Sequence, residues 1–299
     1  MDSLLALSND LAGAVERAGR AVVAVHARRR LPSSGVHWRP GLVVTAEHTV
    51  QAEAGITITR PDGRNVPATL VGRDPGTDLA LLSVEDGGFP TAEMGDTATL
   101  KVGHMVLALG HGPTASLGVV SALGGPWTSL RGGQVDLLVR LDLTLYPGFS
   151  GGPLVGVEGR VLGINTSGLS RLLRLSIPAA TVARVGEELA RTGRVARGYL
   201  GLGMQPVRLP EALRHSLGLP GDHGLIVVNV EPDGPAAAAG LLIGDVLVAL
   251  DGTALSSVGD VQAALARLRA GAAAAVSIVR AGARMEVRLT VGERPRRGR

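Results

Sequence analysis

Ser150 lies in the stretch "YPGFSGGPL" (146–154), with Gly148 two positions before it and two glycines directly after it. A serine hydroxyl is a weak nucleophile near neutral pH. It needs a base to take its proton and a third group to orient that base. It also needs N–H groups directed at the oxyanion that forms. Backbone curled around Phe149 would supply two of these from Gly148 and Ser150, since glycine permits the necessary φ. A tight turn in a barrel is the structural alternative.

The base and its orienting acid have one good candidate each. Among the seven histidines, His48 ends an apolar run in "VVTAEH", and Asp78 directly precedes the apolar run "LALL". Alone, a strand-end histidine is more often structural, and an aspartate before a strand is more often a turn residue. The ordered set of His48, Asp78 and Ser150, each in a fitting local frame, is far more specific for nucleophilic catalysis. The histidines do not cluster at ligand spacing, so we expect neither a metal nor a cofactor.

Composition excludes other classes of protein. The chain has no cysteine, which rules out a disulfide framework and a thiol nucleophile. Its net charge is +4, and the last six residues hold four arginines and no acid. Without those four, the 30 Lys and Arg become 26 and balance the 26 Asp and Glu. With only two Phe, two Trp and two Tyr to stack on bases, we expect no nucleic-acid partner.

No segment has the pattern of a membrane span or of a leader. The apolar region at 4–25 is interrupted by charged residues and falls short of the roughly 20 apolar residues that a spanning helix needs. It also lacks the basic-then-apolar order of a signal peptide. We therefore expect a cytoplasmic protein for the sequence as written. A start further upstream would make it an exported one.

Short apolar runs bounded by glycine-rich turns recur after an amphipathic helix expected at 8–20. Their spacing of roughly 8–12 residues is typical of sandwiches or barrels. A helix expected at 179–191 ends at Gly193. Beyond it the sequence predicts both strands and helices. One helix is expected from Val258 to about Arg269, capped by Ser257. We therefore place a boundary near Val195, between a β-rich domain and a smaller mixed one.

These stretches together resemble the HtrA/Deg family of trypsin-like serine proteases with a C-terminal PDZ domain. The matching segments are "GLVVTAEHTV", "VGRDPGTDLALLSV", "RLDLTLYPGFSGGPLV", "GRVLGINTSG", "RVARGYLGLG" and "GPAAAAGLLIGDVLVALDG". The resemblance implies a mainly β fold, with a trypsin-like double six-stranded β-barrel protease domain followed by an α+β PDZ domain. The expected limits are 1–195 for the protease domain with its N-terminal helix, 196–292 for the PDZ domain, and 293–299 for a basic disordered tail.

The resemblance also implies roles for the candidate residues. Ser150 would be the nucleophile, His48 the general base and acid, and Asp78 the group that holds the imidazole. The N–H groups of Gly148 and Ser150 would form the oxyanion hole. Residues Thr166, Ser167 and Gly168 would pair with the substrate backbone. Residue 144 lies where tryptic enzymes place an acid. Because it is Thr144 here, we expect cleavage after Val, Ala or Leu rather than after Arg or Lys.

In the PDZ domain, the resemblance implies a carboxylate-binding loop and a groove beside it. The loop would be Tyr199, Leu200, Gly201 and Leu202, where a peptide end adds as a strand. The helix from Val258 would form the other wall through its apolar face, of which we expect Val261 and Leu265 to contact the peptide. The alternative is that this face serves only as core.

The leading hypothesis is a serine endopeptidase that cleaves unfolded or damaged proteins, with a PDZ domain that binds peptide C-termini or apolar segments. By analogy with relatives we expect a homotrimer. The alternative is a catalytically inactive protease-fold binding module or chaperone. Two departures from the family pattern support it, namely Phe149 in the oxyanion loop and Glu47 beside His48.

Overall fold

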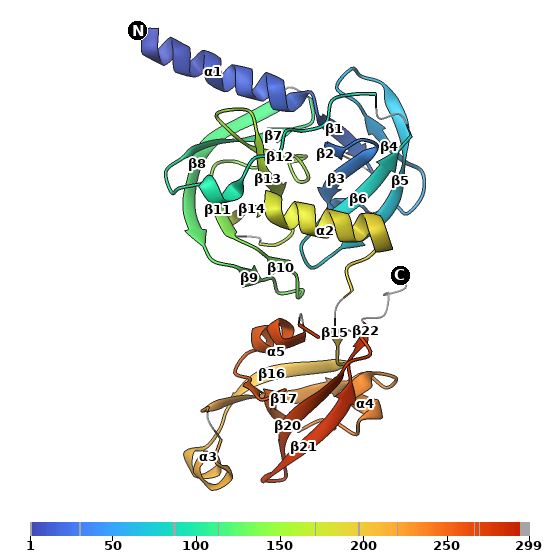
Figure 1. The fold of residues 1–299 in the computed structure, drawn as a ribbon, viewed down its shortest axis with the longest axis vertical. Helices are drawn as coiled ribbons and strands as arrows, with labels where there is room; N and C mark the ends of the chain where they lie inside the picture. The colour runs from blue at the N-terminus through green and yellow to red at the C-terminus, as the bar shows by residue number, and fades with distance from the viewer. Residues whose placement is uncertain are drawn as a thin grey trace. The chain divides into compact units, whose positions relative to one another are not determined.

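The computed structural model describes residues 2–29, 31–85, 88–112, 114–170, 172–196, 198–219, 221–265, 267–268 and 270–293. The chain divides into two compact units, 1–195 and 196–299, and each is described by itself (Figure 1). The basic tail expected at 293–299 lies, from Arg294 on, outside the described residues. None of the described helices is long and apolar enough to cross a membrane.

The first unit contains two closed six-stranded barrels, which confirms the expected architecture (Figure 1). The first barrel has the order β1-β2-β3-β6-β5-β4, and its interior is filled with aliphatic side chains. Its strands are β1 (Val22–His26), β2 (Ser33–Arg39), β3 (Leu42–Ala46), β4 (Ile56–Thr59), β5 (Asn65–Asp74) and β6 (Leu79–Val84).

The second barrel has the order β11-β14-β13-β12-β7-β8, and a small ribbon of β9 and β10 stands beside it. Its strands are β7 (Met105–Gly110), β8 (Thr114–Gly124), β11 (Leu138–Asp142), β12 (Pro153–Gly156), β13 (Val161–Thr166) and β14 (Arg174–Pro178). The ribbon strands are β9 (Trp127–Thr128) and β10 (Gln134–Val135), and two 3₁₀ turns are η1 (Glu47–Thr49) and η2 (Thr97–Thr99).

A buried cluster joins the two barrels and the helix α2 (Ala179–Thr192). It includes Trp38 of the first barrel, Ile164 of the second, and Val182 of α2. The ring of Trp38 lies so close to Gly186 that a Cβ there would be 2.8 Å from it. The helix ends at Gly193 in the left-handed conformation, as its sequence predicts.

The N-terminal helix α1 (Asp2–Gly19) begins earlier than the expected residue 8. Ala14 and Ala18 near its C-terminal end are buried against strands of the second barrel. The other end projects from the barrels (Figure 1) and exposes Leu4 and Leu5. The helix is therefore held by its second half only.

The second unit is a sheet in the order β16-β17-β18-β20-β21 with three short helices. Its strands are β15 (Gly198–Tyr199), β16 (Leu202–Arg208), β17 (His223–Val230), β18 (Val246–Leu250), β19 (Thr253–Ala254), β20 (Ala273–Arg280), β21 (Ala283–Thr290) and β22 (Gly292–Glu293). Its helices are α3 (Glu211–Leu217), α4 (Pro235–Ala238) and α5 (Val258–Leu265). β16 lies at an edge, with β17 as its one partner among the described strands.

Helix α5 begins as its sequence predicts but ends earlier. Asp260 N–H donates to Ser257 Oγ at 3.2 Å, and the Asp260 carboxylate accepts from the N–H of Ser257 at 2.8 Å. This reciprocal pair is the capping box expected there. The helix ends at Leu265 rather than near residue 269, and residues 266 and 269 lie outside the described residues.

One ion pair anchors the second unit. Asp245 is almost fully buried and accepts two hydrogen bonds of 2.7 Å from the Arg280 guanidinium. Burial alone would raise the pKa of Asp245, but Arg280 and the Leu242 N–H hold it below its usual value. A depressed carboxyl pKa stabilises the fold above the ordinary pKa of aspartate, and this stabilisation is lost as pH falls through the folded-state value.

Arg280→Ala is expected to destabilise the second unit near pH 7, because it leaves the buried Asp245 carboxylate without its ion-pair partner. Hydrogen exchange of β17 and β18 in the full chain measures this. The difference should shrink in acid, where Asp245 is protonated in both proteins. Arg284→Ala on the same hairpin is the control, since its exposed side chain forms no ion pair among the described residues. An equal loss in both variants would contradict the expectation.

Candidate active site

His48 and Asp78 meet at one end of a strand pair in the first barrel. β3 and β6 are antiparallel, with Ala46 opposite Leu79, so the turn after β3 and the loop before β6 lie side by side. Glu47 N–H donates to the Asp78 carbonyl at 3.0 Å. His48 N–H donates to Asp78 Oδ1 at 2.8 Å. These two N–H groups therefore hold Asp78 beside the turn that carries His48, independently of the imidazole.

The imidazole–carboxylate contact has the geometry that a general base requires. His48 Nδ1 lies 2.8 Å from Asp78 Oδ2, and the carboxylate is fully buried while 26% of the histidine side chain is exposed. Thr166 Oγ1 donates to the same carboxylate oxygen. Because Nδ1 carries the proton in that contact, Nε2 is left as the acceptor that faces the cleft.

The loop that carries Asp78 is held from two directions. Buried Asp74 accepts hydrogen bonds from Gly76 N–H at 3.1 Å and from Thr77 Oγ1 at 2.6 Å. From the turn between β9 and β10, Ser129 Oγ donates to the Gly76 carbonyl at 2.6 Å. Asp78 itself has a φ of 59°, which is uncommon for a residue with a side chain. These contacts hold that conformation.

The loop before Ser150 forms a turn that frees two N–H groups. Phe149 N–H donates to the Tyr146 carbonyl at 3.0 Å, and Gly148 has a φ of 95°. Proline second and glycine third are the residues of a type II turn. Among the described residues, the N–H groups of Gly148 and Ser150 have no acceptor. Their role as oxyanion hole stays a prediction, but both donors are available.

Ser34 of the first barrel holds this loop, and the sequence gives no sign of that role. Its hydroxyl donates to the Gly148 carbonyl at 2.7 Å and accepts from the His111 N–H at 2.8 Å. Its N–H donates to the Ser150 carbonyl at 3.1 Å. Ser34 thus fixes the carbonyls on either side of Phe149 while the N–H groups stay free.

The two rings that flank the serine play different parts. Phe149 is buried and lies so close to Gly110 that a Cβ there would be 2.6 Å from the ring. Tyr146 is half exposed and meets Phe149 edge to face, with ring centroids 5.4 Å apart. Phe149 therefore anchors the loop in the second barrel, and Tyr146 forms part of the cleft surface.

Ser167 stands between the nucleophile and the base. Its Oγ lies 3.0 Å from Ser150 Oγ and 3.3 Å from His48 Nε2, and its N–H donates to Ser150 Oγ at 3.3 Å. No hydrogen bond joins Ser150 Oγ directly to His48 Nε2, although the structure describes both residues. The segment expected to pair with substrate therefore also contacts the triad, since Gly168 packs against Asp78 and His48.

Glu47 lies beside the base but points to two arginines. Its carboxylate is 3.7 Å from Arg73 and 3.9 Å from Arg131. Burial raises the pKa of Glu47, and the negative charge of Asp78 raises it further. Glu47 therefore links loops around the site and does not occupy the cleft.

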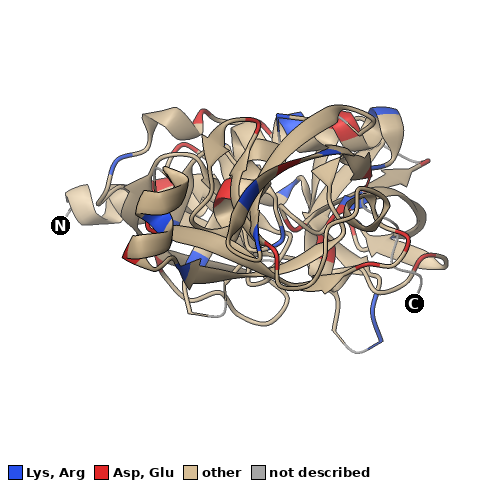
Figure 2. Ribbon diagram, turned by 90° about the horizontal axis from the view of Figure 1, so that it is seen from below, with Lys and Arg blue, Asp and Glu red and all other residues tan. Residues whose placement is uncertain are grey.

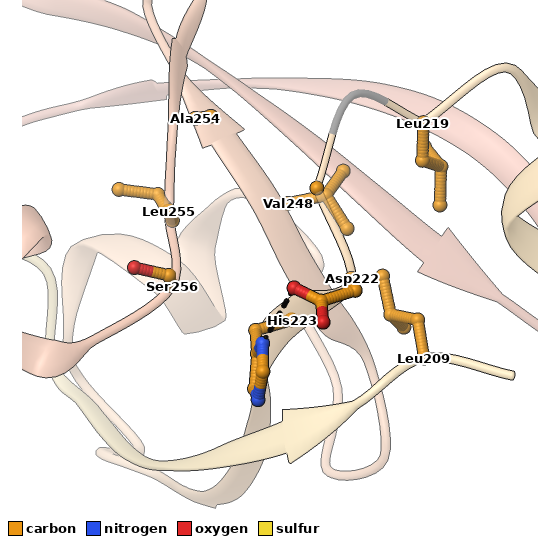
Figure 3. Close-up of a pocket in the computed structure, with 9 residues that line it drawn as sticks. Leu209, Leu219, Asp222, His223, Val248, Ala254, Leu255 and Ser256 are labelled. Carbon is orange, nitrogen blue, oxygen red and sulfur yellow. Dashed lines mark hydrogen bonds and ion pairs between the residues drawn. The ribbon is translucent and has the colours of Figure 1, made fainter.

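Two hollows differ greatly in size. The cleft at Ser150 and His48 encloses about 550 Å³. A second hollow, in the other unit, encloses about 90 Å³ between Leu209, Leu219 and Val248, beside the Asp222–His223 contact (Figure 3). Ligand pockets usually measure roughly 300–1,000 Å³. The cleft is therefore the better candidate. Thr144 is exposed and does not line it, so its place in a specificity pocket stays a prediction.

The candidate peptide-binding residues of the second unit divide into two groups. The carbonyls of Leu200 and Gly201 accept from Ala236 and Glu231 at 2.9 Å, while their N–H groups have no acceptor among the described residues. Tyr199 and Leu202 are partly buried beside them. Val261 and Leu265, by contrast, are buried in the core. Contact of these two with a peptide stays a prediction.

Comparison with known proteins identifies the family. Residues 33–164 match the trypsin-like peptidase domain and 198–291 match the PDZ domain. The solved structure "HtrA-type protease AlgW with decapeptide" is 31% identical, with a TM-score of 0.74 over 95% of this chain and 99% of that one. The chain belongs to the HtrA/Deg family. The serine endoprotease from Yersinia pestis is 32% identical to this HtrA-type chain, with a TM-score of 0.73 over 94% of it and 97% of that structure.

A curated relative corrects one expectation. The "Probable periplasmic serine endoprotease DegP-like" of Pseudomonas fulva is 36% identical over 268 residues, which are 86% of this chain and 54% of the relative. The HtrA-type chain thus spans about half the length of the curated relatives it matches. The expected cytoplasmic location is wrong, because relatives named periplasmic point to an exported protein. The pattern at 4–25 misled because it reports only local structure: residues 4–19 lie in helix α1 and residues 22–25 in strand β1.

Gly148→Ala is expected to lower kcat by about 10²–10³-fold, the usual effect of losing an oxyanion donor. At a φ of 95° an alanine is strained, and its Cβ would lie 3.2 Å from His111 Nε2. Hydrolysis of a peptide ester measures this. Gly103→Ala is the control, since Gly103 has a φ of 92° and open space around it. Similar losses in both variants would contradict a role specific to the site.

Ser167→Ala is expected to speed the reaction of Ser150 with a small fluorophosphonate by roughly two- to tenfold, since one hydrogen bond that competes with His48 is lost. Mass spectrometry of the labelled Ser150 peptide gives the rate. Ser167→Thr keeps the hydroxyl and should react like the wild type. Slower labelling of the alanine variant alone would instead mean that Ser167 passes the proton on to His48.

Proposed function

We propose that this HtrA-type chain is a serine endopeptidase that cuts unfolded or damaged polypeptides. The observation that carries the proposal is the buried Asp78 carboxylate bonded to His48 in the cleft that also holds Ser150, where the N–H groups of Gly148 and Ser150 have no acceptor among the described residues. Each part of a nucleophilic mechanism has a candidate group, and Ser167 lies between the candidate nucleophile and the candidate base. The family membership supports the same chemistry.

The mechanism follows from these positions. Ser150 Oγ attacks the scissile carbonyl carbon as its proton passes to His48 Nε2. The N–H groups of Gly148 and Ser150 hold the oxyanion. Asp78 keeps the Nδ1 proton in place and stabilises the imidazolium, which then protonates the leaving amine. Water attacks the acyl-enzyme with His48 as base, and Ser150 regains its proton as the cleaved chain leaves with a carboxylate.

We propose that the second unit binds peptide C-termini. Edge strand β16 can pair with an added strand, and the free N–H groups of Leu200 and Gly201 can donate to a terminal carboxylate. Partly buried Leu202 and Met204 supply apolar surface along β16. A homotrimer, as the resemblance implies, fits the exposed leucines of α1.

Digestion of an unfolded casein-like substrate tests the proposal. Wild type should cleave it, and Ser150→Ala should lose on the order of 10⁶ in turnover, as in other serine proteases without their nucleophile. Mass spectrometry of the products should place the cuts after Val, Ala or Leu. Cuts clustered after Arg and Lys would contradict this predicted specificity. If neither protein cleaves, even with a C-terminal peptide added, a binding module becomes the better description.

A further inference from the structure

The cleft continues beyond the triad toward the loop between β1 and β2. Its lining includes His48, Ser150 and Ser167 and also Arg28, Arg29 and Leu31. Gly148 adjoins the Pro32 carbonyl, to which Arg28 donates. The far end is therefore built by a segment of the first barrel for which the proposed mechanism has no use. Ser167 contacts Ser150, whereas the segment with Arg28 contacts the loop at Gly148 through Pro32.

The position of this end defines which part of a substrate reaches it. In the proposed function, on which this inference rests, the 166–168 edge pairs with the residues before the scissile bond. The scissile carbonyl lies at Gly148 and Ser150. The chain after the scissile bond must then leave across the cleft toward Arg28 and Arg29. These side chains thus face residues on the C-terminal side of the cut.

The charge at this end is positive and not neutralised. The half-buried Arg28 guanidinium donates to the carbonyls of Leu31 at 2.5 Å and Pro32 at 3.4 Å, which orient it but carry no charge. Arg29 is exposed and has no ion pair among the described residues. Among the described residues no acid lines the cleft, whereas elsewhere acidic and basic residues are interspersed along the ribbon (Figure 2).

The acidic residues nearest to His48 in sequence form ion pairs with an arginine outside the cleft. Glu47 and Glu53 each lie 3.7 Å from Arg73. The pKa of His111, whose ring adjoins Gly148, reflects the same surroundings. Burial lowers it most, and the positive charges of His26 and Arg28 lower it further. Arg28 also lies near the oxyanion loop, because the Pro32 carbonyl that it contacts adjoins Gly148.

We propose that Arg28 and Arg29 form a subsite for acidic side chains on the C-terminal side of the scissile bond. An arginine held by carbonyls is preorganised to bond a carboxylate. A lysine at the same substrate position would meet two like charges. The subsite thus selects among unfolded chains by the charge that follows the cut, independently of the residue before it.

Matched peptides with a Glu, Gln or Lys two residues after a Val–Ala scissile bond test this. Each ends in an amide, so that no terminal carboxylate engages the second unit. Wild type should cleave the Glu peptide with a kcat/KM roughly tenfold above that of the Lys peptide. The ratio should fall as salt rises from 0.05 to 0.5 M, because salt screens exposed charges. The double variant Arg28→Glu, Arg29→Glu should cleave the Lys peptide faster than the Glu peptide.

The ratio of kcat/KM for the Glu peptide to that for the Lys peptide is compared within each protein, so a general loss of activity cancels. Arg140→Glu is the control, because it reverses an exposed charge on β11 that does not line the cleft and should keep the wild-type ratio. Equal cleavage of the Glu and Lys peptides by wild type would overturn the proposal while leaving the protease intact.

Binding gives a readout that does not need cleavage. Fluorescence anisotropy of the same amidated peptides on Ser150→Ala protein should show the Glu peptide bound more tightly, with the preference lost in the variant that also carries both arginine reversals. If wild type cleaves nothing but the Glu preference in binding is present, the proposed function fails and the subsite stands. Equal binding of the Glu and Lys peptides would overturn the subsite.

Discussion

The polar contact of Ser34 with the Ser150 loop is the constraint on which the site depends. The first barrel carries His48 and Asp78, and the second carries Ser150. No contact within either barrel fixes the distance between Ser150 and the other two residues. Ser34 bonds the carbonyls of Gly148 and Ser150, and Thr45 Oγ1 donates to the Ser34 carbonyl at 2.6 Å. This chain of buried bonds ties the nucleophile to the strand that leads to His48.

Close backbone approach makes that contact possible. A Cβ at Gly151 would lie 2.1 Å from the Ser34 carbonyl, and one at Gly152 would lie 2.1 Å from the Leu109 carbonyl. Both glycines are therefore required by space, and the first also by its φ of 88°. The glycines around Ser150 therefore have two structural roles. Gly148 shapes the turn, while the two that follow let the barrels meet.

The parts of the site that could be predicted are those with a local signal. His48, Asp78 and Ser150 each border an apolar strand, and the strands brought His48 and Asp78 together as their pattern indicates. Ser34, and the bridging position of Ser167, could not be predicted. Both depend on loops that approach across the barrels, and neither has a spacing or a neighbour that signals it.

The second unit shows a different limit of sequence reasoning. The apolar face of α5 was correctly placed, but a hydrophobic pattern does not distinguish a groove wall from core. Val261 and Leu265 are buried in the core, while Leu268 is only partly buried beside it. The free N–H groups of Leu200 and Gly201 depend on where Ala236 and Glu231 donate, which follows from tertiary structure.

The scarcity of aromatic rings has a spectroscopic consequence. Both tryptophans, Trp38 and Trp127, belong to the first unit, and among Phe, Trp and Tyr the second has only Tyr199. Trp38 is buried where both barrels and α2 meet. Tryptophan emission therefore reports on the first unit, because the second has no tryptophan. Fluorescence and circular dichroism recorded together would separate the two transitions without any label.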